Sequence, residues 1–293
     1  MRQFPAAEIR RAVRIALEED LALGDVTTST LFPHRTPGRA TITAQQDLVS
    51  AGLTAAVQTF LAVDPSLSVT PLCKEGDLLL SGQSLMGVEG DGRSILMAER
   101  VALNFLQHLS GIATLTRKFR DAVKDYPVTI LDTRKTLPGL RALEKWAVTL
   151  GGGQNHRRSL GDGILIKDNH LSLLKAQKQG VREACRRARK KALDTLTVIV
   201  EVESLADVRQ ALAGKADVIL LDNMTPRMVR QAVTLIKERA LVEVSGGITL
   251  DNVQEMAAAG PDFISIGALT HSAPAATLSL ELEPLPHRPR KRH

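Results

Sequence analysis

The chain has 293 residues, more than the usual single domain of about 100–200 residues, and its 44% hydrophobic content is enough to bury a sizeable core. Its formal net charge of +6 favours anionic partners, but one Trp, one Tyr and six Phe are too few for the aromatic platforms that grip single-stranded nucleic acid. The two cysteines, Cys73 and Cys185, form neither a disulfide framework nor a metal-ligand pattern.

Two further observations favour a soluble protein with no membrane partner. The N-terminus lacks the apolar core of about 7–15 residues that a signal peptide needs. The longest uncharged stretch, residues 48–63, contains Ser, Gly, Thr and Gln and is too short to span a bilayer. We therefore expect a cytoplasmic location.

Much of the positive charge lies in two segments, residues 182–191 and the tail at residues 286–293. A solvated helix face and a frayed chain end explain these segments without a ligand. We therefore predict no nucleic-acid partner.

The first part of the chain, residues 1–108, has the pattern of a mixed α and β domain. Ile9 and Val13 lie on one face of a predicted surface helix, and Gly24-Asp25 then signals a turn. Further elements are predicted as strands at residues 39–44 and 68–72, an apolar helix at residues 52–60, and a long helix at residues 94–123 that breaks near Gly111.

After Tyr126 the pattern changes to short apolar runs that alternate with helix-length segments. Six runs end in a polar residue or glycine, at Asp132, Lys167, Glu201, Asp222, Ser245 and Gly267. Helices are predicted between the later runs, at residues 205–213, 226–240 and 251–260. Strands and helices in alternation indicate a parallel β/α architecture, and short connections between buried strands favour a barrel over an open sheet.

The ends of these six runs are the predicted location of the site. In β/α barrels the active site forms at the carboxyl ends of the strands, where the connecting loops converge. A single strand often ends in a charged residue simply because it reaches solvent. Six successive runs that all end in a polar residue or glycine instead predict a functional site at the carboxyl ends of the strands.

A group of cations follows the first two runs. Arg134 and Lys135 come directly after one run, and Lys167 ends the next. Between them a glycine-rich loop, GGGQNHRR, supplies His156 and Arg157. Arginine forks bind carboxylates and phosphates bidentately, so this group fits a compact anion that carries more than one such group. The alternative is scattered surface charge.

Glycines at the ends of the last two runs have the pattern of a phosphate site. They occur in Ser245-Gly246-Gly247 and in Gly267-Ala268, about one β/α unit apart. Without side chains, such residues let backbone N–H groups approach a phosphate closely. The alternative is that they are only turn residues.

Acidic residues end the middle runs. With Asp222 at the next run's end, Glu201 is a candidate for binding ribose hydroxyls or a pyrophosphate that carries a metal ion. Glu203, two residues on, is either a supporting partner or an exposed acid. No His/Cys cluster indicates a structural zinc site, and neither a P-loop nor a dinucleotide-binding glycine fingerprint occurs.

Taken together, these blocks resemble the quinolinate phosphoribosyltransferase family, the carboxylating nicotinate-nucleotide diphosphorylases. The matching segments are EEDL, GDVT, ERVALNFLQHLSG, LDTRKTLPGLR, GGGQNHR, ILIKDNH, VEVE, LLDN, SGGI and ISIGALTHS. The resemblance covers nearly the whole chain, except the basic tail after about residue 285.

The resemblance implies an α/β fold with an N-terminal α/β sandwich at residues 1–108, which a C-terminal segment at about residues 272–285 joins. An open seven-stranded β/α barrel would then span residues 109–271. The implied catalytic residues are Lys135, Lys167, Glu201 and Asp222. The implied substrate-binding residues are Arg100, Thr133, Arg134, Lys135, His156, Arg157, Lys167, Glu201, Asp222, Ser245, Gly246, Gly247, Ile266, Gly267, Ala268 and His271, with no metal held by the protein alone.

The resemblance also implies the reaction. Phosphoribosyl pyrophosphate and quinolinate would give nicotinate mononucleotide, pyrophosphate and carbon dioxide in NAD biosynthesis, with Mg²⁺ bound through the donor's pyrophosphate. A homodimer would share its active sites, because Arg100 matches an arginine that enters the neighbouring subunit. Two alternatives remain: a paralogue associated with molybdenum transport that uses another acceptor, and a non-catalytic protein that binds anions or nucleic acid.

Overall fold

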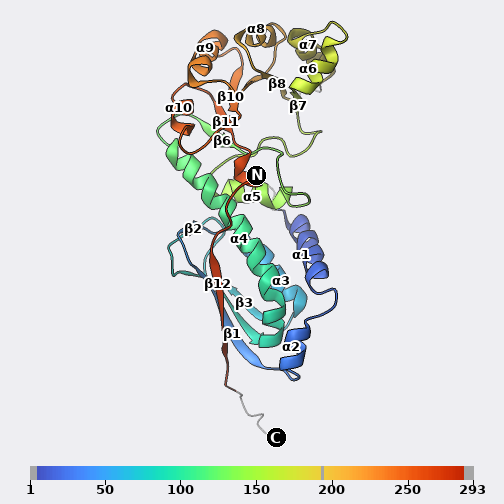
Figure 1. Cartoon of the computed structure of the whole chain (residues 1–293), viewed down its shortest axis with the longest axis vertical. Coiled ribbons are helices and arrows are strands. Elements are labelled where there is room, and N and C mark those ends of the chain that lie inside the picture. Colours follow the sequence, from blue (N-terminus) through green and yellow to red (C-terminus); the bar gives the residue numbers. More distant parts are fainter. Residues whose placement is uncertain (1–4, 193–194, 287–293) are drawn as a thin grey trace. The chain divides into compact units, whose positions relative to one another are not determined.

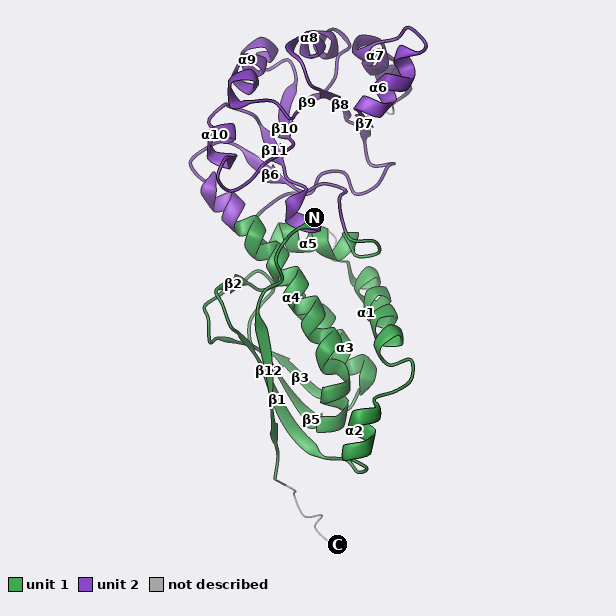
Figure 2. Ribbon diagram, in the orientation of Figure 1, with its two compact units in different colours: residues 1–117, 137–152, 272–293 green, residues 118–136, 153–271 purple. Residues whose placement is uncertain are grey.

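The computed structural model describes residues 5–192 and 195–286, which form two compact units (Figure 2). Unit 1 comprises residues 1–117, 137–152 and 272–293, and unit 2 comprises residues 118–136 and 153–271. Of the predicted basic tail, all but residue 286 lies outside the described residues. No helix among the described residues is both long and apolar enough to cross a bilayer.

Unit 1 is built on a four-stranded antiparallel sheet in the order β12-β1-β5-β3, with a separate two-stranded sheet, β2-β4. The strands are β1 Pro37–Ala44, β2 Leu48–Val49, β3 Ser68–Pro71, β4 Leu78–Leu79, β5 Ser84–Asp91 and β12 Leu278–Pro284. The helices are α1 Ala6–Asp20, α2 Val26–Leu31, α3 Leu53–Val63, α5 Arg141–Leu150 and most of α4 Gly92–Ala122. β12, from the end of the chain, pairs with β1 along its whole length.

The core of unit 1 lies between this sheet and helices α3 and α4 (Figure 1). Alternate residues of β1, such as Ala40 and Ile42, are buried, as expected for a strand with one face against a core. Phe60 of α3 and Leu106 of α4 are fully buried in the same cluster. Apolar burial of this kind is the main favourable term in folding.

Helix α4 runs without interruption from Gly92 to Ala122, so the predicted break near Gly111 is wrong. The glycine has a packing role instead. A Cβ atom at Gly111 would overlap the carbonyl oxygen of Pro274, which belongs to the C-terminal segment of the same unit. Close approach of another backbone therefore explains this glycine, and the helix continues through it because tertiary packing outweighs propensity.

Unit 2 contains a parallel sheet of six strands in the order β6-β11-β10-β9-β8-β7. All six predicted runs form its strands, which are β6 Thr129–Leu131, β7 Ile164–Ile166, β8 Val198–Val202, β9 Val218–Asp222, β10 Leu241–Ser245 and β11 Phe263–Ser265. Its helices are α6 Asp168–Lys175, α7 Val181–Lys191, α8 Leu205–Ala213, α9 Pro226–Ile236, α10 Val253–Ala257 and α11 Ala268–His271. Helices α7 to α10 lie around the outside of the strands (Figure 1).

The barrel is open and differs in detail from the seven strands expected. Within the described residues, six strands form the ladder, and a single parallel bridge between Leu131 and Gln154 extends it beside β6. That bridge stands in the place of a seventh strand. Strands β8 and β9 are buried on both faces, as is typical of a parallel sheet covered by helices.

Local sequence signals set where the helices of unit 2 begin. Ser204 accepts a hydrogen bond from the backbone N–H of Asp207 at the start of α8. Thr225 does the same for Met228 in α9, with Pro226 at the first helical position. Because the six strands pair in parallel, their carboxyl ends lie at one end of the barrel.

Candidate active site at the barrel mouth

A cavity of about 310 Å³ opens at the carboxyl ends of the barrel strands. Its lining residues all belong to unit 2 and are Thr133, Arg134, Lys135, His156, Arg157, Leu165, Lys167, Glu201, Leu220, Asp222, Glu243, Ser245 and Ser265. Nine of these were predicted as site residues from the sequence. The structure thus brings the predicted cations and the predicted acids into one cavity.

Asp132, at the end of β6, organises the glycine-rich loop. Its side chain is fully buried and accepts hydrogen bonds from the backbone N–H of His156 (2.8 Å) and from Nδ2 of Asn155 (2.7 Å). Its own N–H donates to the carbonyl of Gln154. These bonds hold the backbone of His156 in place, a role that was not predicted for Asp132 beyond its position at a strand end.

Arg134 and Arg157 form the cationic part of the cavity. The Nε atom of Arg134 is buried and has no hydrogen-bond partner among the described residues. Burial lowers the pKa of the Arg157 guanidinium, and the like charge of Arg134 lowers it further. Nη1 of Arg157 donates to the carbonyl of Gly163 at 3.3 Å. Two guanidinium groups that repel each other in a partly buried cavity favour the binding of an anion, because the anion offsets their positive charges.

The acids occupy the neighbouring strands. Glu201 on β8 is 8% exposed and its Oε2 lies 2.7 Å from Nζ of Lys167. Burial raises the pKa of Asp222 on β9, and the negative charge of Glu201 adds to this, whereas Lys167 opposes it. Glu203 is exposed, and its charge also contributes to the raised pKa of Asp222.

The predicted phosphate-site glycines have different roles. Gly246 (φ +89°) lies so close to Asn223 that a Cβ atom at this position would overlap Asn223 Oδ1. Gly247 (φ +61°) faces open space, and its carbonyl accepts a hydrogen bond from Nδ2 of Asn252 at 2.8 Å. Packing and backbone conformation explain Gly246, whereas Gly247 leaves its backbone open to a ligand.

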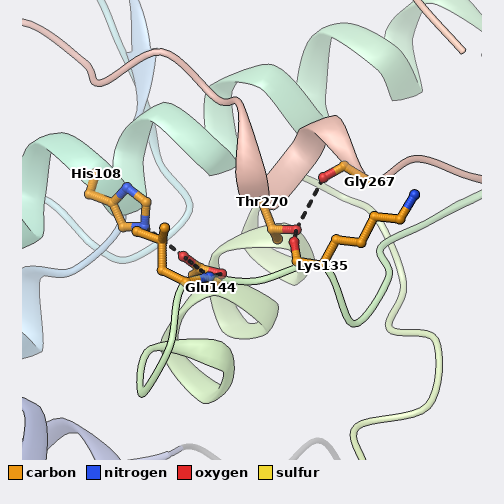
Figure 3. A network of polar contacts seen from close by, with 6 residues as sticks. His108, Lys135, Glu144, Gly267 and Thr270 are labelled. Carbon is orange, nitrogen blue, oxygen red and sulfur yellow. Dashed lines mark hydrogen bonds and ion pairs between the residues drawn. The ribbon is translucent and has the colours of Figure 1, made fainter. Parts of the chain in front are cut away.

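At the end of β11, the side chain of Lys135 lies over Gly267 (Figure 3). A Cβ atom at Gly267 would come within 3.0 Å of Lys135 Cδ and 3.1 Å of His271 Nε2. Thr270 Oγ1 donates to the Lys135 carbonyl at 2.7 Å and fixes that loop. Ile266 is buried beneath the loop and Ala268 begins α11, so neither lines the cavity.

Arg100 is not in this cavity. It lies on α4 in unit 1 and lines a second cavity there with residues of α1, among them Arg11 and Glu19. Also in unit 1, Nε2 of His108 lies 2.9 Å from Oε1 of Glu144. Glu144 accepts the N–H of Leu137 as well, so this buried pair anchors the loop that begins after Thr136 (Figure 3).

Four lining residues were missed from the sequence: Leu165, Leu220, Glu243 and Ser265. Glu243 is the most consequential, because it is a carboxylate at 2% exposure. The signal was present, since Glu243 lies two residues before Ser245 on β10 and therefore on the same face.

The opposing influences on Asp222 give a testable prediction. Glu201→Gln removes a like charge, so the pKa of Asp222 should fall; Lys167→Met removes a cation, so that pKa should rise. Carbon NMR titration of labelled aspartate carboxyls would measure both changes. Asp64 is the control, because hydrogen bonds from Ser66 keep its pKa low in unit 1. A shift of Asp222 in the same direction in both variants would contradict this account of its environment.

Comparison with known proteins gives the family. The model of the quinolinate phosphoribosyl transferase N-terminal domain matches residues 25–110, and that of the C-terminal domain matches residues 112–281. A probable carboxylating nicotinate-nucleotide pyrophosphorylase of Bacillus subtilis is 39% identical over 264 residues, which are 90% of each chain. One from Methanocaldococcus jannaschii is 38% identical over 93% of this chain and 96% of its own.

Solved structures agree with this. The nicotinate-nucleotide pyrophosphorylase of Francisella tularensis matches with a TM-score of 0.89 and 36% identity, over 96% of this chain and 98% of that one. The predicted fold class, an antiparallel N-terminal sandwich with a parallel barrel-like domain, is confirmed by this likeness. The chain therefore belongs to the quinolinate phosphoribosyltransferase family, the carboxylating nicotinate-nucleotide pyrophosphorylases.

Proposed function

We propose that the barrel cavity is where this chain transfers a phosphoribosyl group from phosphoribosyl pyrophosphate to the nitrogen of quinolinate. The products are nicotinate mononucleotide, pyrophosphate and carbon dioxide, a step of NAD biosynthesis. The observation that carries the proposal is the pair Arg134 and Arg157, whose positive charges repel each other. In addition, the buried Nε atom of Arg134 has no hydrogen-bond partner among the described residues. Quinolinate has two carboxylates, which match two guanidinium groups.

The acceptor lies on the cationic side of the cavity. Arg134 and Arg157 each bind a carboxylate, and Lys167 adds a third positive charge beside them. Thr133 and His156 complete this part of the wall. Burial lowers the pKa of Arg157 and the like charge of Arg134 lowers it further; an anion here relieves that repulsion.

The donor lies over the acids and the glycine ends. Backbone N–H groups near Gly247 and Ala268, with the Ser245 hydroxyl, hold the 5′-phosphate. Glu201 and Asp222 bind the ribose hydroxyls from the adjacent strand ends. Gly246, Ile266, Gly267 and His271 support this loop region.

These residues suit a dissociative transfer followed by decarboxylation. As pyrophosphate leaves, positive charge develops at C1 of the ribose, and the carboxylates of Glu201 and Asp222 stabilise it. The quinolinate nitrogen then bonds to C1. The resulting pyridinium ring accepts the electron pair of the C–C bond that breaks when carbon dioxide leaves, and a proton completes the product.

We assign the proton to Lys135, which lines the cavity, because the other candidates are engaged in contacts. Its ammonium group can give a proton to the ring carbon and become a neutral amine. His156 is less suited, because its Nδ1 accepts the backbone N–H of Arg157 at 2.7 Å and its Nε2 lies 3.3 Å from Oε2 of Glu243. Lys167 is already paired with Glu201.

The acids also fit a magnesium ion that arrives on the donor. Magnesium commonly uses substrate phosphates together with one or two carboxylates. Glu201 and Asp222 supply two carboxylates. Burial raises the pKa of Asp222 and the negative charge of Glu201 raises it further, and a divalent cation would relieve that repulsion. Bound there, the ion would offset the negative charge of the leaving pyrophosphate.

We also propose a homodimer in which Arg100 of one subunit enters the site of the other. The support is that Arg100 lies on α4 in unit 1, is not among the residues that line the barrel cavity, and matches the family arginine that acts in this way. The predicted domain bounds, residues 1–108 with about 272–285 and residues 109–271, and the cytoplasmic location stay predictions.

The reaction itself is tested by carbon dioxide release from carboxyl-labelled quinolinate. Release should require both phosphoribosyl pyrophosphate and magnesium, and kcat/KM for nicotinate should be at least about 100-fold lower, because a site built for two charged groups leaves one unpaired. No release with both substrates present, or equal use of nicotinate, would overturn the proposal. Turnover of a different acceptor alone would favour a paralogue, and salt-sensitive DNA binding without turnover would favour the non-catalytic alternative.

The shared site is tested by mixing Arg100→Ala and Lys167→Ala homodimers under exchanging conditions. Half of the dimers become mixed, and one site in each carries neither lesion. Activity should therefore recover to about a quarter of the wild-type value. Lys167→Ala mixed with Asp222→Ala is the matched control: both lesions lie in the barrel, every site keeps one, and nothing should recover. No recovery in the first mixture, despite measured exchange, would contradict a shared site.

A further inference from the structure

We propose that Glu243 is a positioning residue that fixes the ring and tautomer of His156 and, through His156, the backbone of Arg157. The effect on turnover rests on the function proposed above. The effect on His156 itself does not, so the two can be tested separately.

The His156 ring is held at both of its nitrogens. Nδ1 accepts a hydrogen bond from the backbone N–H of Arg157 at 2.7 Å, and Nε2 lies 3.3 Å from Oε2 of Glu243. The side chain of His156 is 9% exposed, and that of Glu243 is 2% exposed. Asp132 holds the backbone of His156 at 2.8 Å, so neither the ring nor its attachment can move without breaking a buried contact.

This arrangement selects one tautomer. An imidazole nitrogen that accepts a backbone N–H must offer a lone pair, so Nδ1 of His156 carries no proton. The proton of the neutral ring is then on Nε2, which lies 3.3 Å from Oε2 of Glu243, and we assign that carboxylate as its acceptor. A carboxylate that accepts a hydrogen bond from one ring nitrogen commonly sets the tautomer of a histidine.

Burial makes Glu243 an unusual choice for a merely structural position. It lies in the middle of β10, opposite Leu220 of β9 and Phe263 of β11. An apolar side chain of similar volume in such a place is often equally stable or more so. Its Oε1 atom is buried, has no hydrogen-bond partner among the described residues, and belongs to a side chain that lines the cavity. A role toward the cavity explains a carboxylate here better than packing does.

The connection to substrate passes through Arg157. The N–H that Nδ1 of His156 accepts is that of Arg157, whose guanidinium is one of the two cations proposed for quinolinate. If the ring turns, the backbone of Arg157 loses this partner. Loss of Glu243 should therefore weaken quinolinate binding and leave the donor, on the other side of the cavity, little affected.

Two variants of similar volume separate the hydrogen bond from the charge. Glu243→Gln keeps an oxygen that accepts the Nε2 proton, whereas Glu243→Met fills the same space without an acceptor. Nitrogen NMR of histidine-labelled full-length protein should report the Nε2-protonated neutral ring for His156 in the wild type and in Glu243→Gln, with the resonances assigned by His156→Ala. In Glu243→Met the pattern should change to a mixture of the two neutral tautomers, because Nε2 has lost the acceptor of its proton.

The kinetic expectation is a selective change. Glu243→Met should raise KM for quinolinate by about tenfold, the equivalent of roughly 1.4 kcal/mol, with KM for phosphoribosyl pyrophosphate changed by less than about twofold. Glu243→Gln should restore most of the quinolinate KM. In a His156→Ala background, Glu243→Met should add little, because the residue acts through His156.

An unchanged His156 spectrum in Glu243→Met would overturn the proposal. So would an equal rise of both KM values, or a Glu243→Gln variant as impaired as Glu243→Met. If the wild type fails to turn over quinolinate, the function proposed above fails, but the NMR result still decides whether Glu243 fixes His156.

Discussion

Arg134 and Arg157 bring two positive charges close together in a cavity that is only partly open to water. Burial lowers the pKa of the Arg157 guanidinium, and the like charge of Arg134 lowers it further. Folding retains them because the surrounding backbone is held by other bonds, above all those that the buried carboxylate of Asp132 accepts from Asn155 and His156. The rigid loop keeps the cations in place for an anion from outside the chain.

The acids complete a division of charge across the barrel mouth. The loop after β6 supplies Arg134 and the glycine-rich loop before β7 supplies Arg157, whereas β8 and β9 supply Glu201 and Asp222. Lys167 bridges the two by its 2.7 Å contact with Glu201. An anionic acceptor and a developing cation on the donor's ribose need opposite environments a few ångströms apart, and a parallel sheet provides them because neighbouring strands end side by side.

The sequence predicted the six strands of the barrel because each is a short apolar run with a polar or glycine end, and it predicted nine cavity residues because strand ends converge. Glu243 was missed although it shares a strand face with Ser245, because the prediction considered the ends of the strands and Glu243 lies in the middle of β10. The break at Gly111 was wrong because the sequence cannot show that Pro274 approaches the helix there. The distinct roles of Gly246 and Gly247 depend likewise on Asn223, which reaches Gly246 only in the folded chain.

Calorimetric binding of quinolinate and of nicotinate tests most directly whether the two guanidinium groups form the acceptor site. The account predicts that Arg134→Gln and Arg157→Gln each weaken quinolinate binding by about tenfold or more, as expected for a lost charged hydrogen bond of roughly 1.5–3 kcal/mol. Nicotinate, with one carboxylate, should lose much less in at least one of the two variants. Arg187→Gln, on the exposed face of α7, serves as the control for a change of net charge. Unchanged quinolinate affinity in both site variants would contradict the account.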